Sequence, residues 1–126
     1  MKAFHYRLKN GERSTDAVKY HAIVYMRGSS AYRLALHREI VSTIPERKRR
    51  WAVSDPVSGA LVLRVTATYK GMPVSSESLT IAQAREFALA DLDRLVDRVG
   101  LDQFESVMGN TEARVRALMA NERVAA

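Results

Sequence analysis

Residues 80–100 carry the sequence TIAQAREFALADLDRLVDRVG, which predicts one long helix. Thr80 and Gln83 have the spacing of a capping box, in which the hydroxyl and the amide side chain each satisfy a backbone amide at the helix start. Gly100 is typical of the residue that ends a helix. Apolar side chains recur between them at helical spacing, at Ile81, Ala84, Ala88, Leu92, Leu95 and Val99. We therefore expect a helix whose apolar stripe packs against another layer or a second copy of itself.

Two shorter helices are expected after Gly100, at 102–108 and 111–122, on either side of Gly109-Asn110. The first contains Phe104, Val107 and Met108 as docking residues, and the second contains Val115, Leu118 and Met119. The C-terminal half of the chain is therefore predicted to be helical.

Alternation with a period of two residues predicts strands in the N-terminal half. Residues 2–9 alternate in this way, and Asn10-Gly11 is a strong turn signal after them. Residues 51–54 and 60–70 flank the segment Asp55-Pro56-Val57-Ser58-Gly59. Because proline and glycine favour turns between antiparallel strands, these two runs predict a hairpin.

Residues 15–27 fit both a helix and a strand. Thr15 or Asp16 could cap a helix that stops at Gly28, but apolar residues between them also alternate as in a strand. We favour the helix, because the cap, the length and the terminal glycine agree. Residues 31–44 mix both periods, and here too we favour a helix, closed by Pro45.

These elements predict an α+β fold. A small antiparallel sheet, with strands near 2–9, 51–54 and 60–70, would pack against helices at 80–100, 102–108 and 111–122. The length of 126 residues is typical of one domain, so we expect residues 1–126 to form a single unit. The sequence has no apolar run long enough for a signal peptide or a membrane span, which predicts a cytoplasmic protein with no membrane partner.

Catalytic and metal-binding motifs are absent from the sequence. There is no cysteine, which excludes disulfides, thiolate metal sites and cysteine nucleophiles. His5, His21 and His37 lack the spacing that places two metal ligands on one face of a helix or strand. No nucleophile elbow and no glycine-rich phosphate loop is present. We therefore expect no enzyme activity, no metal and no cofactor; catalysis by the histidines would require at least two of them to converge in a cleft.

The charge is distributed unevenly along the chain. Residues 1–70 hold 14 Lys/Arg against 5 Asp/Glu, a net charge of +9, whereas residues 71–126 hold 6 against 9, a net charge of −3. A positive region of this density attracts polyanions, as in nucleic-acid-binding proteins. Excess cations can also serve solubility alone, and that interpretation stays open.

The segment Glu46-Arg47-Lys48-Arg49-Arg50-Trp51 is the strongest candidate site. Its four consecutive cations could contact phosphates and release counterions, and Trp51 could stack on an unpaired base. The simpler alternative is a solvated turn before a strand. Three further arginines extend the basic character of the N-terminal half, and we include them as candidate nucleic-acid contacts: Arg27, Arg33 and Arg38.

Residues 3–32 resemble the opening of plasmid mobilisation relaxases of the Mob type. The resemblance is carried by Phe4-His5 and Lys9 on the first predicted strand, and by residues across the helix predicted next and its exit: His21, Tyr25-Met26, Arg27 and Tyr32. Those enzymes need a closely spaced histidine cluster that holds a metal, together with a tyrosine nucleophile, and the His-x-His motif is absent here. The resemblance implies a relative that keeps DNA affinity without strand cleavage.

The leading hypothesis is a non-enzymatic nucleic-acid-binding or accessory protein. The alternative is a small protein-interaction module, such as a phage or mobile-element inhibitor or adaptor of a nucleic-acid-handling complex. A homodimer formed through residues 80–100 is compatible with both hypotheses.

Overall fold

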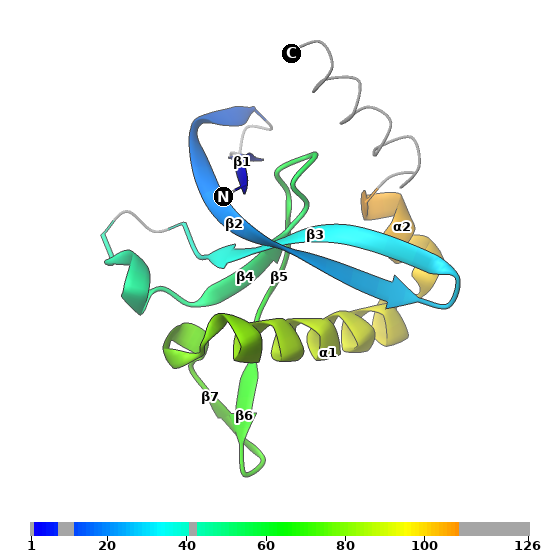
Figure 1. Ribbon diagram of the computed structural model, residues 1–126. Coiled ribbons are helices and arrows are strands. Elements are labelled where there is room, and N and C mark those ends of the chain that lie inside the picture. Colours follow the sequence, from blue (N-terminus) through cyan, green and yellow to red (C-terminus); the bar gives the residue numbers. More distant parts are fainter. Residues whose placement is uncertain (1, 8–11, 41–42, 109–126) are drawn as a thin grey trace.

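A computed structural model describes residues 2–7, 12–40 and 43–108 of the chain (Figure 1). Five strands form one antiparallel sheet in the order of the sequence. They are β1 (Lys2–Arg7), β2 (Arg13–Arg27), β3 (Ser30–Arg38), β4 (Trp51–Ser54) and β5 (Leu61–Arg64). A separate two-stranded sheet consists of β6 (Ala67–Tyr69) and β7 (Met72–Val74). The helices are α1 (Ile81–Val99) and α2 (Leu101–Met108), with short 3-10 helices η1 (Glu46–Lys48) and η2 (Ser76–Ser78).

Strand β2 is long enough to pair with two neighbours over different parts of its length. Its first part, up to Tyr20, pairs with β1, and its second part, from His21, pairs with β3. The strand curves strongly along its length, and β1 lies beside its first part, away from β4 (Figure 1).

The predicted helix at 15–27 is wrong, because this segment belongs to β2. Ile23 and Tyr25 are each only 2% exposed, whereas Val24 and Met26 on the other face are 53% and 67% exposed. This alternation matches a strand and gives no helical stripe, and β-branched and aromatic residues favour strands. Gly28, with a φ of +59°, makes the hairpin turn to β3 instead of ending a helix.

The predicted helix at 31–44 is also wrong. Its first part is β3, in which Tyr32, Leu34 and Leu36 share the buried face. The strand ends at Arg38, and η1 begins at Glu46 after Pro45; residues 41 and 42 lie outside the described residues. The mixed periods of this segment arise because both faces of β3 are buried near its end, at Ala35 and His37 as well as at Leu36.

The strand predicted near 2–9 is confirmed over its described part as β1, and that predicted at 51–54 is confirmed as β4. Residues 8–11, with the predicted Asn10-Gly11 turn, lie outside the described residues. The predicted hairpin joins β4 to β5. The single strand predicted at 60–70 is divided into β5 and β6, which belong to different sheets. Between β6 and β7, Lys70 (φ 51°) and Gly71 (φ 79°) make a two-residue turn with both φ angles positive, the geometry favoured in tight hairpins. The resulting hairpin projects beyond α1, away from the larger sheet (Figure 1).

The two predicted helices at 80–100 and 102–108 are confirmed as α1 and α2. The capping box forms as expected: the amide of Gln83 donates to the Thr80 hydroxyl at 3.2 Å, and the Thr80 amide donates to the Gln83 side chain at 3.0 Å. Gly100 follows α1 with a φ of +87°. The helix predicted at 111–122 lies outside the described residues.

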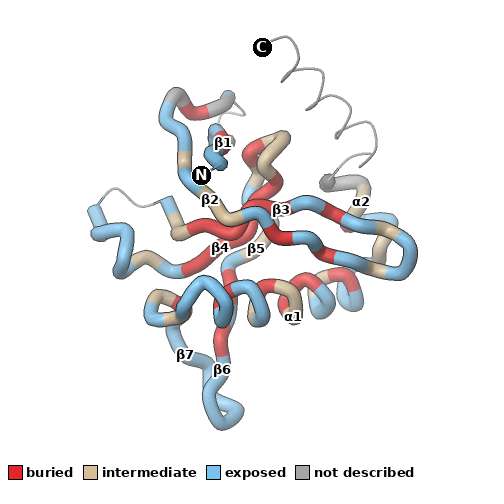
Figure 2. Tube along the Cα trace, viewed as in Figure 1, coloured by how far each residue is buried: buried red, intermediate tan, exposed pale blue. Residues whose placement is uncertain are grey.

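Helix α1 covers one face of the larger sheet, and the hydrophobic core lies between them. Buried residues, red in Figure 2, lie along β3 and β4 and on α1. Ala84, Ala88, Leu92 and Val96 form the buried stripe of the helix. The fold class is α+β, as predicted, with more strand than expected. In the described part of the chain no helix is long and apolar enough to cross a membrane.

Candidate anion-binding pocket

A concave pocket of about 290 Å³ lies where β2, β3 and the segment around η1 meet. Lys19 from β2, Arg38 from the end of β3, and Arg49 just after η1 contribute its cationic side chains. Ala17, Val18 and Glu46 complete the lining. Three positive charges from three separate segments therefore share one concavity, with a single carboxylate among the residues that line it.

Arg38 is held rigidly in this pocket. Its guanidinium carbon lies 4.1 Å from the centre of the Trp51 ring, so that the cation stacks on the aromatic face. Its Nη1 donates to the backbone carbonyls of Arg49 (2.8 Å) and Glu77 (2.6 Å). Burial lowers the pKa of Arg38, and the negative charges of Glu46 and Glu77 act in the opposite direction. An arginine stays charged even so, because its ordinary pKa is far above neutrality.

No carboxylate of the described residues forms an ion pair with Arg38. Glu46 and Glu77 act on Arg38 only through space, and the two hydrogen bonds of its Nη1 go to backbone carbonyls and not to a carboxylate. Its planar fork of N–H donors suits phosphate and carboxylate oxygens. The pocket therefore has the chemistry of an anion site.

Backbone hydrogen bonds order the segment that carries the other cations. Pro45 precedes η1, and its carbonyl accepts from the Lys48 amide at 2.9 Å. The Arg49 side chain turns back to donate from Nε to the Ile44 carbonyl at 2.7 Å. Arg49 is half-buried by these contacts, whereas Arg47, Lys48 and Arg50 are exposed. The predicted cluster thus contains one arginine that lines the pocket and three cations that face solvent beside it in the chain.

Trp51 requires a correction, because it was expected to stack on an unpaired base. Its ring is only 4% exposed, and Nε1 donates to the Leu79 carbonyl at 3.2 Å. Arg38 covers the ring, and the centre of the His21 ring lies 6.3 Å from it. A ring buried to this degree cannot accept a base, so the contribution of Trp51 to the pocket is to position Arg38.

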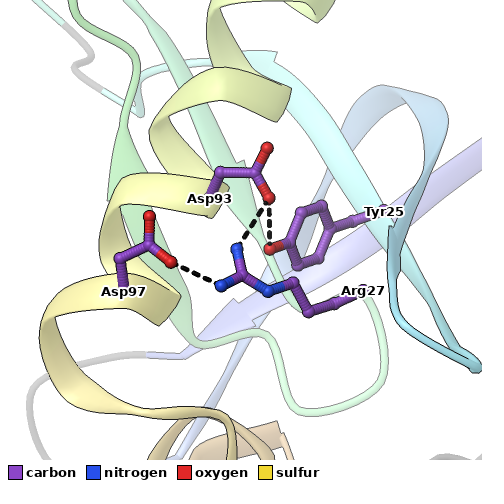
Figure 3. Close-up of polar contacts among 4 residues, drawn as sticks. All are labelled: Tyr25, Arg27, Asp93 and Asp97. Atoms are coloured by element: carbon purple, nitrogen blue, oxygen red, sulfur yellow. Dashed lines mark hydrogen bonds and ion pairs between the residues drawn. The ribbon is translucent and has the colours of Figure 1, made fainter.

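Arg27 is also removed from the set of free cations. Its guanidinium donates to Asp93 at 3.1 Å and makes a second contact with Asp97, both on α1 (Figure 3). The hydrogen bond to Asp97, and to a lesser extent that to Asp93, raises the pKa of Arg27. Tyr25 donates to the same Asp93 oxygen (Figure 3). Arg27 is thus neutralised locally and ties the end of β2 to the helix.

Arg33 is exposed but lies elsewhere. It pairs across the β2–β3 hairpin with Val24, on the sheet face turned away from α1. Arg38 lies on the α1 side of the same strand, since its guanidinium stacks on Trp51. Of the three additional arginines predicted as contacts, the structure brings only Arg38 to the pocket.

Lys19 is the pocket residue that the candidate set lacked. It is an exposed position of β2 and pairs with Ala3 of β1. Lys19 has the same parity along β2 as the buried Ile23 and Tyr25, so a strand places it on the side of the sheet that carries Arg38. The predicted helix gave no reason to group Lys19 with Arg38.

A larger cavity of about 400 Å³ between β5 and α1 is a weaker candidate, although Arg64, Arg94 and Arg98 line it. Arg94 pairs with Asp91, and Arg64 pairs with Glu39 at 3.0 Å. Its arginines are therefore largely compensated by carboxylates, unlike Arg38.

The histidines are engaged in separate places. His37 is buried, with Nδ1 2.7 Å from the Arg38 carbonyl and Nε2 2.7 Å from the Ser54 hydroxyl. His5 contacts the Ser14 carbonyl through Nδ1 at 2.9 Å, and His21 lies beside Trp51. Within residues 2–7, 12–40 and 43–108 no group of three or more His, Asp or Glu side chains could hold a metal ion.

In comparisons with known proteins, no family model, no curated protein and no solved structure matches the chain.

Proposed function

We propose that this protein binds nucleic acid without catalysing a reaction on it, and that the phosphate backbone enters the pocket formed by Lys19, Arg38 and Arg49. The observation that carries the proposal is the Arg38 guanidinium, fixed by Trp51 and two carbonyls and left without a carboxylate partner among the described residues.

The exposed cations of the same segment extend this site. Arg47, Lys48 and Arg50 face solvent next to Arg49 in the chain. Each phosphate that such side chains neutralise releases condensed counterions, which favours binding at low salt whatever the base sequence. The pocket would fix the register of the backbone, and the exposed cations would supply most of the salt-dependent affinity.

The relaxase-like residues 3–32 favour DNA over RNA as the first polyanion to test. They support a protein that accompanies DNA processing, as an accessory subunit of a mobile element would. The net charge of +9 over residues 1–70 agrees with this role.

The test is the salt dependence of binding, measured by fluorescence anisotropy with labelled single-stranded and duplex DNA. Replacing Arg47, Lys48 and Arg50 together by alanine should flatten the slope of log K against log salt by up to about three units on duplex. The matched control replaces Arg33, Arg85 and Arg98 by alanine, which removes the same charge from other exposed positions. Equal losses for both triple variants, or no binding by the wild type at about 50 mM salt, would refute the proposal.

A second candidate is a protein-interaction module, favoured by the outer face of the β2–β3 hairpin. Val24 and Met26 are 53% and 67% exposed there, beside Arg33. Exposed apolar side chains next to an arginine are common in protein interfaces. A pull-down that recovers one stoichiometric protein partner even after nuclease treatment, and that fails with Met26→Lys, would support this function over the first. Light scattering would detect self-association.

A further inference from the structure

The β6–β7 hairpin is exposed along most of its length. Of its six strand residues only Ala67 is buried, and the tip appears entirely pale blue in Figure 2. Tyr69 and Met72 face each other across the turn and are 66% and 68% exposed. Because both side chains are largely exposed, they lie outside the core and are accessible to another molecule.

A cation accompanies these apolar side chains. Lys70 Nζ lies 5.4 Å from the centre of the Tyr69 ring, at the first position of the two-residue turn. The tip therefore combines an aromatic ring, a flexible thioether and a positive charge. This combination suits a base and its phosphate, because a ring stacks on a base while a cation neutralises the backbone.

The base of the hairpin is bonded to the anion pocket. β7 is followed directly by η2, which packs against η1. Within η2, Ser76 accepts from the Trp51 amide at 2.9 Å, and the Glu77 carbonyl accepts from Arg38 at 2.6 Å. From Ser76 back to Gly71 the chain spans about 17 Å if extended, since a strand rises about 3.3 Å per residue. A few nucleotides bound at the pocket would reach the tip.

We propose that Tyr69 stacks on an unpaired base, so that the hairpin makes the protein prefer single-stranded over duplex nucleic acid. This inference rests on the proposed function and adds the class of substrate to it. The tip has no arginine, asparagine or glutamine for bidentate pairing with base edges, and its cation, Lys70, lies 5.4 Å from the centre of the Tyr69 ring. An exposed aromatic ring accepts any base that is free of its own stack, so the expected recognition is tolerant of sequence.

The decisive comparison uses the full chain and two labelled oligonucleotides of equal length and charge, oligo-dT and its abasic counterpart. Tyr69→Ala should weaken binding to oligo-dT by about tenfold or more without changing the salt slope, because stacking on a base is not a counterion effect. Tyr69→Phe should keep the affinity, since it keeps the ring. Neither variant should alter binding to the abasic strand.

Controls separate stacking from damage to the hairpin. Val74→Ala removes an exposed apolar side chain from the same hairpin and should leave oligo-dT binding unchanged. Lys70→Ala should lower the salt slope by about one unit. If wild-type protein binds both oligonucleotides alike and Tyr69→Ala changes nothing, the hairpin inference is overturned while the proposed function stands. An equal loss on the abasic strand, or a change in oligomeric state with no effect on DNA, also overturns the inference. If the wild type binds neither oligonucleotide at about 50 mM salt, the proposed function itself fails.

Discussion

The Tyr25 hydroxyl donates a hydrogen bond to Asp93 at 2.8 Å, joining residues 68 positions apart in the chain. Tyr25 lies in the core with its ring against Phe104, and only its hydroxyl end reaches the helix surface (Figure 3). Burial raises the pKa of Tyr25 to about 12, and the hydrogen bond to the negatively charged Asp93 adds to the shift. The contact therefore fixes the helix to β2 only while the tyrosine keeps its proton.

This contact predicts a loss of stability at high pH that Tyr25→Phe should remove. In the unfolded chain a tyrosine loses its proton near pH 10, whereas in the folded protein Tyr25 keeps it up to about 12. Within that window the unfolded state binds fewer protons, so the free energy of unfolding falls as pH rises, by about 2 to 3 kcal/mol in all. Urea unfolding at pH 8, 10 and 11 should show this slope in the wild type and a shallower one in Tyr25→Phe. A Tyr25→Phe slope equal to that of the wild type would contradict this assignment.

Because His37 is buried, the protein should lose stability at acidic pH. Burial lowers the pKa of His37, outweighing the raising effects of the Arg38 carbonyl and Glu39. In the unfolded chain a histidine takes up a proton near pH 6.5, whereas the folded protein keeps His37 neutral to a lower pH. The free energy of unfolding should therefore fall as the pH drops below about 6.5 toward the lowered pKa. His37→Gln should be less stable at neutral pH but show a flatter dependence between pH 7 and 5. Parallel pH dependences for the wild type and His37→Gln would argue against a buried neutral His37.

Local signals were sufficient for α1 but not for β2. The Thr80 and Gln83 cap and the apolar stripe lie within the helix itself, so the sequence specifies them without tertiary information. In β2 the possible cap at Thr15 or Asp16 and the terminal Gly28 imitate a helix. What decides the strand is burial of Ile23 and Tyr25 beneath a helix that lies more than fifty residues later in the chain. When a segment fits both helical and strand periodicity, the element that packs against it, here α1, decides which structure forms.

The candidate site shows the same limit. The run Arg47–Arg50 is visible in the sequence and remains largely exposed. The roles of Arg27 and Arg38 depend on distant residues: Asp93 and Asp97 neutralise the first, and the Glu77 carbonyl holds the second. Because Trp51 follows the four cations in the sequence, sequence proximity groups it with them as a binding residue. Its contacts with the Leu79 carbonyl and with Arg38 instead bury it.

Asp91 on α1 binds Thr66, which lies in the chain between β5 and β6, and this contact predicts a cost in stability when it is removed. This carboxylate is 8% exposed and accepts from the Thr66 amide at 2.7 Å and from the Thr66 hydroxyl at 2.9 Å. It thereby bonds α1 to the residue where the chain leaves the larger sheet. Asp91→Ala should cost about 2 to 3 kcal/mol, because it leaves a partly buried amide and hydroxyl without their acceptor. Chemical denaturation is the measurement, and Glu86→Ala at an exposed position of the same helix should change stability by less than about 0.5 kcal/mol. A cost for Asp91→Ala no larger than that of the control would show that water replaces the carboxylate.

Arg38 and Trp51 supply a direct optical test of the pocket, since Trp51 is the single tryptophan of the chain. An anion that engages the guanidinium changes the charge stacked 4.1 Å from the ring centre, so titration with inorganic phosphate or oligo-dT should alter the tryptophan emission. Arg38→Lys keeps the charge but loses the planar stacking and the forked donors, and it should weaken binding while abolishing most of the emission change. Arg50→Lys makes the same chemical change at an exposed position and should leave both nearly unaltered. If the two lysine variants behave alike, binding depends on net charge alone and the fixed geometry of Arg38 contributes nothing to it.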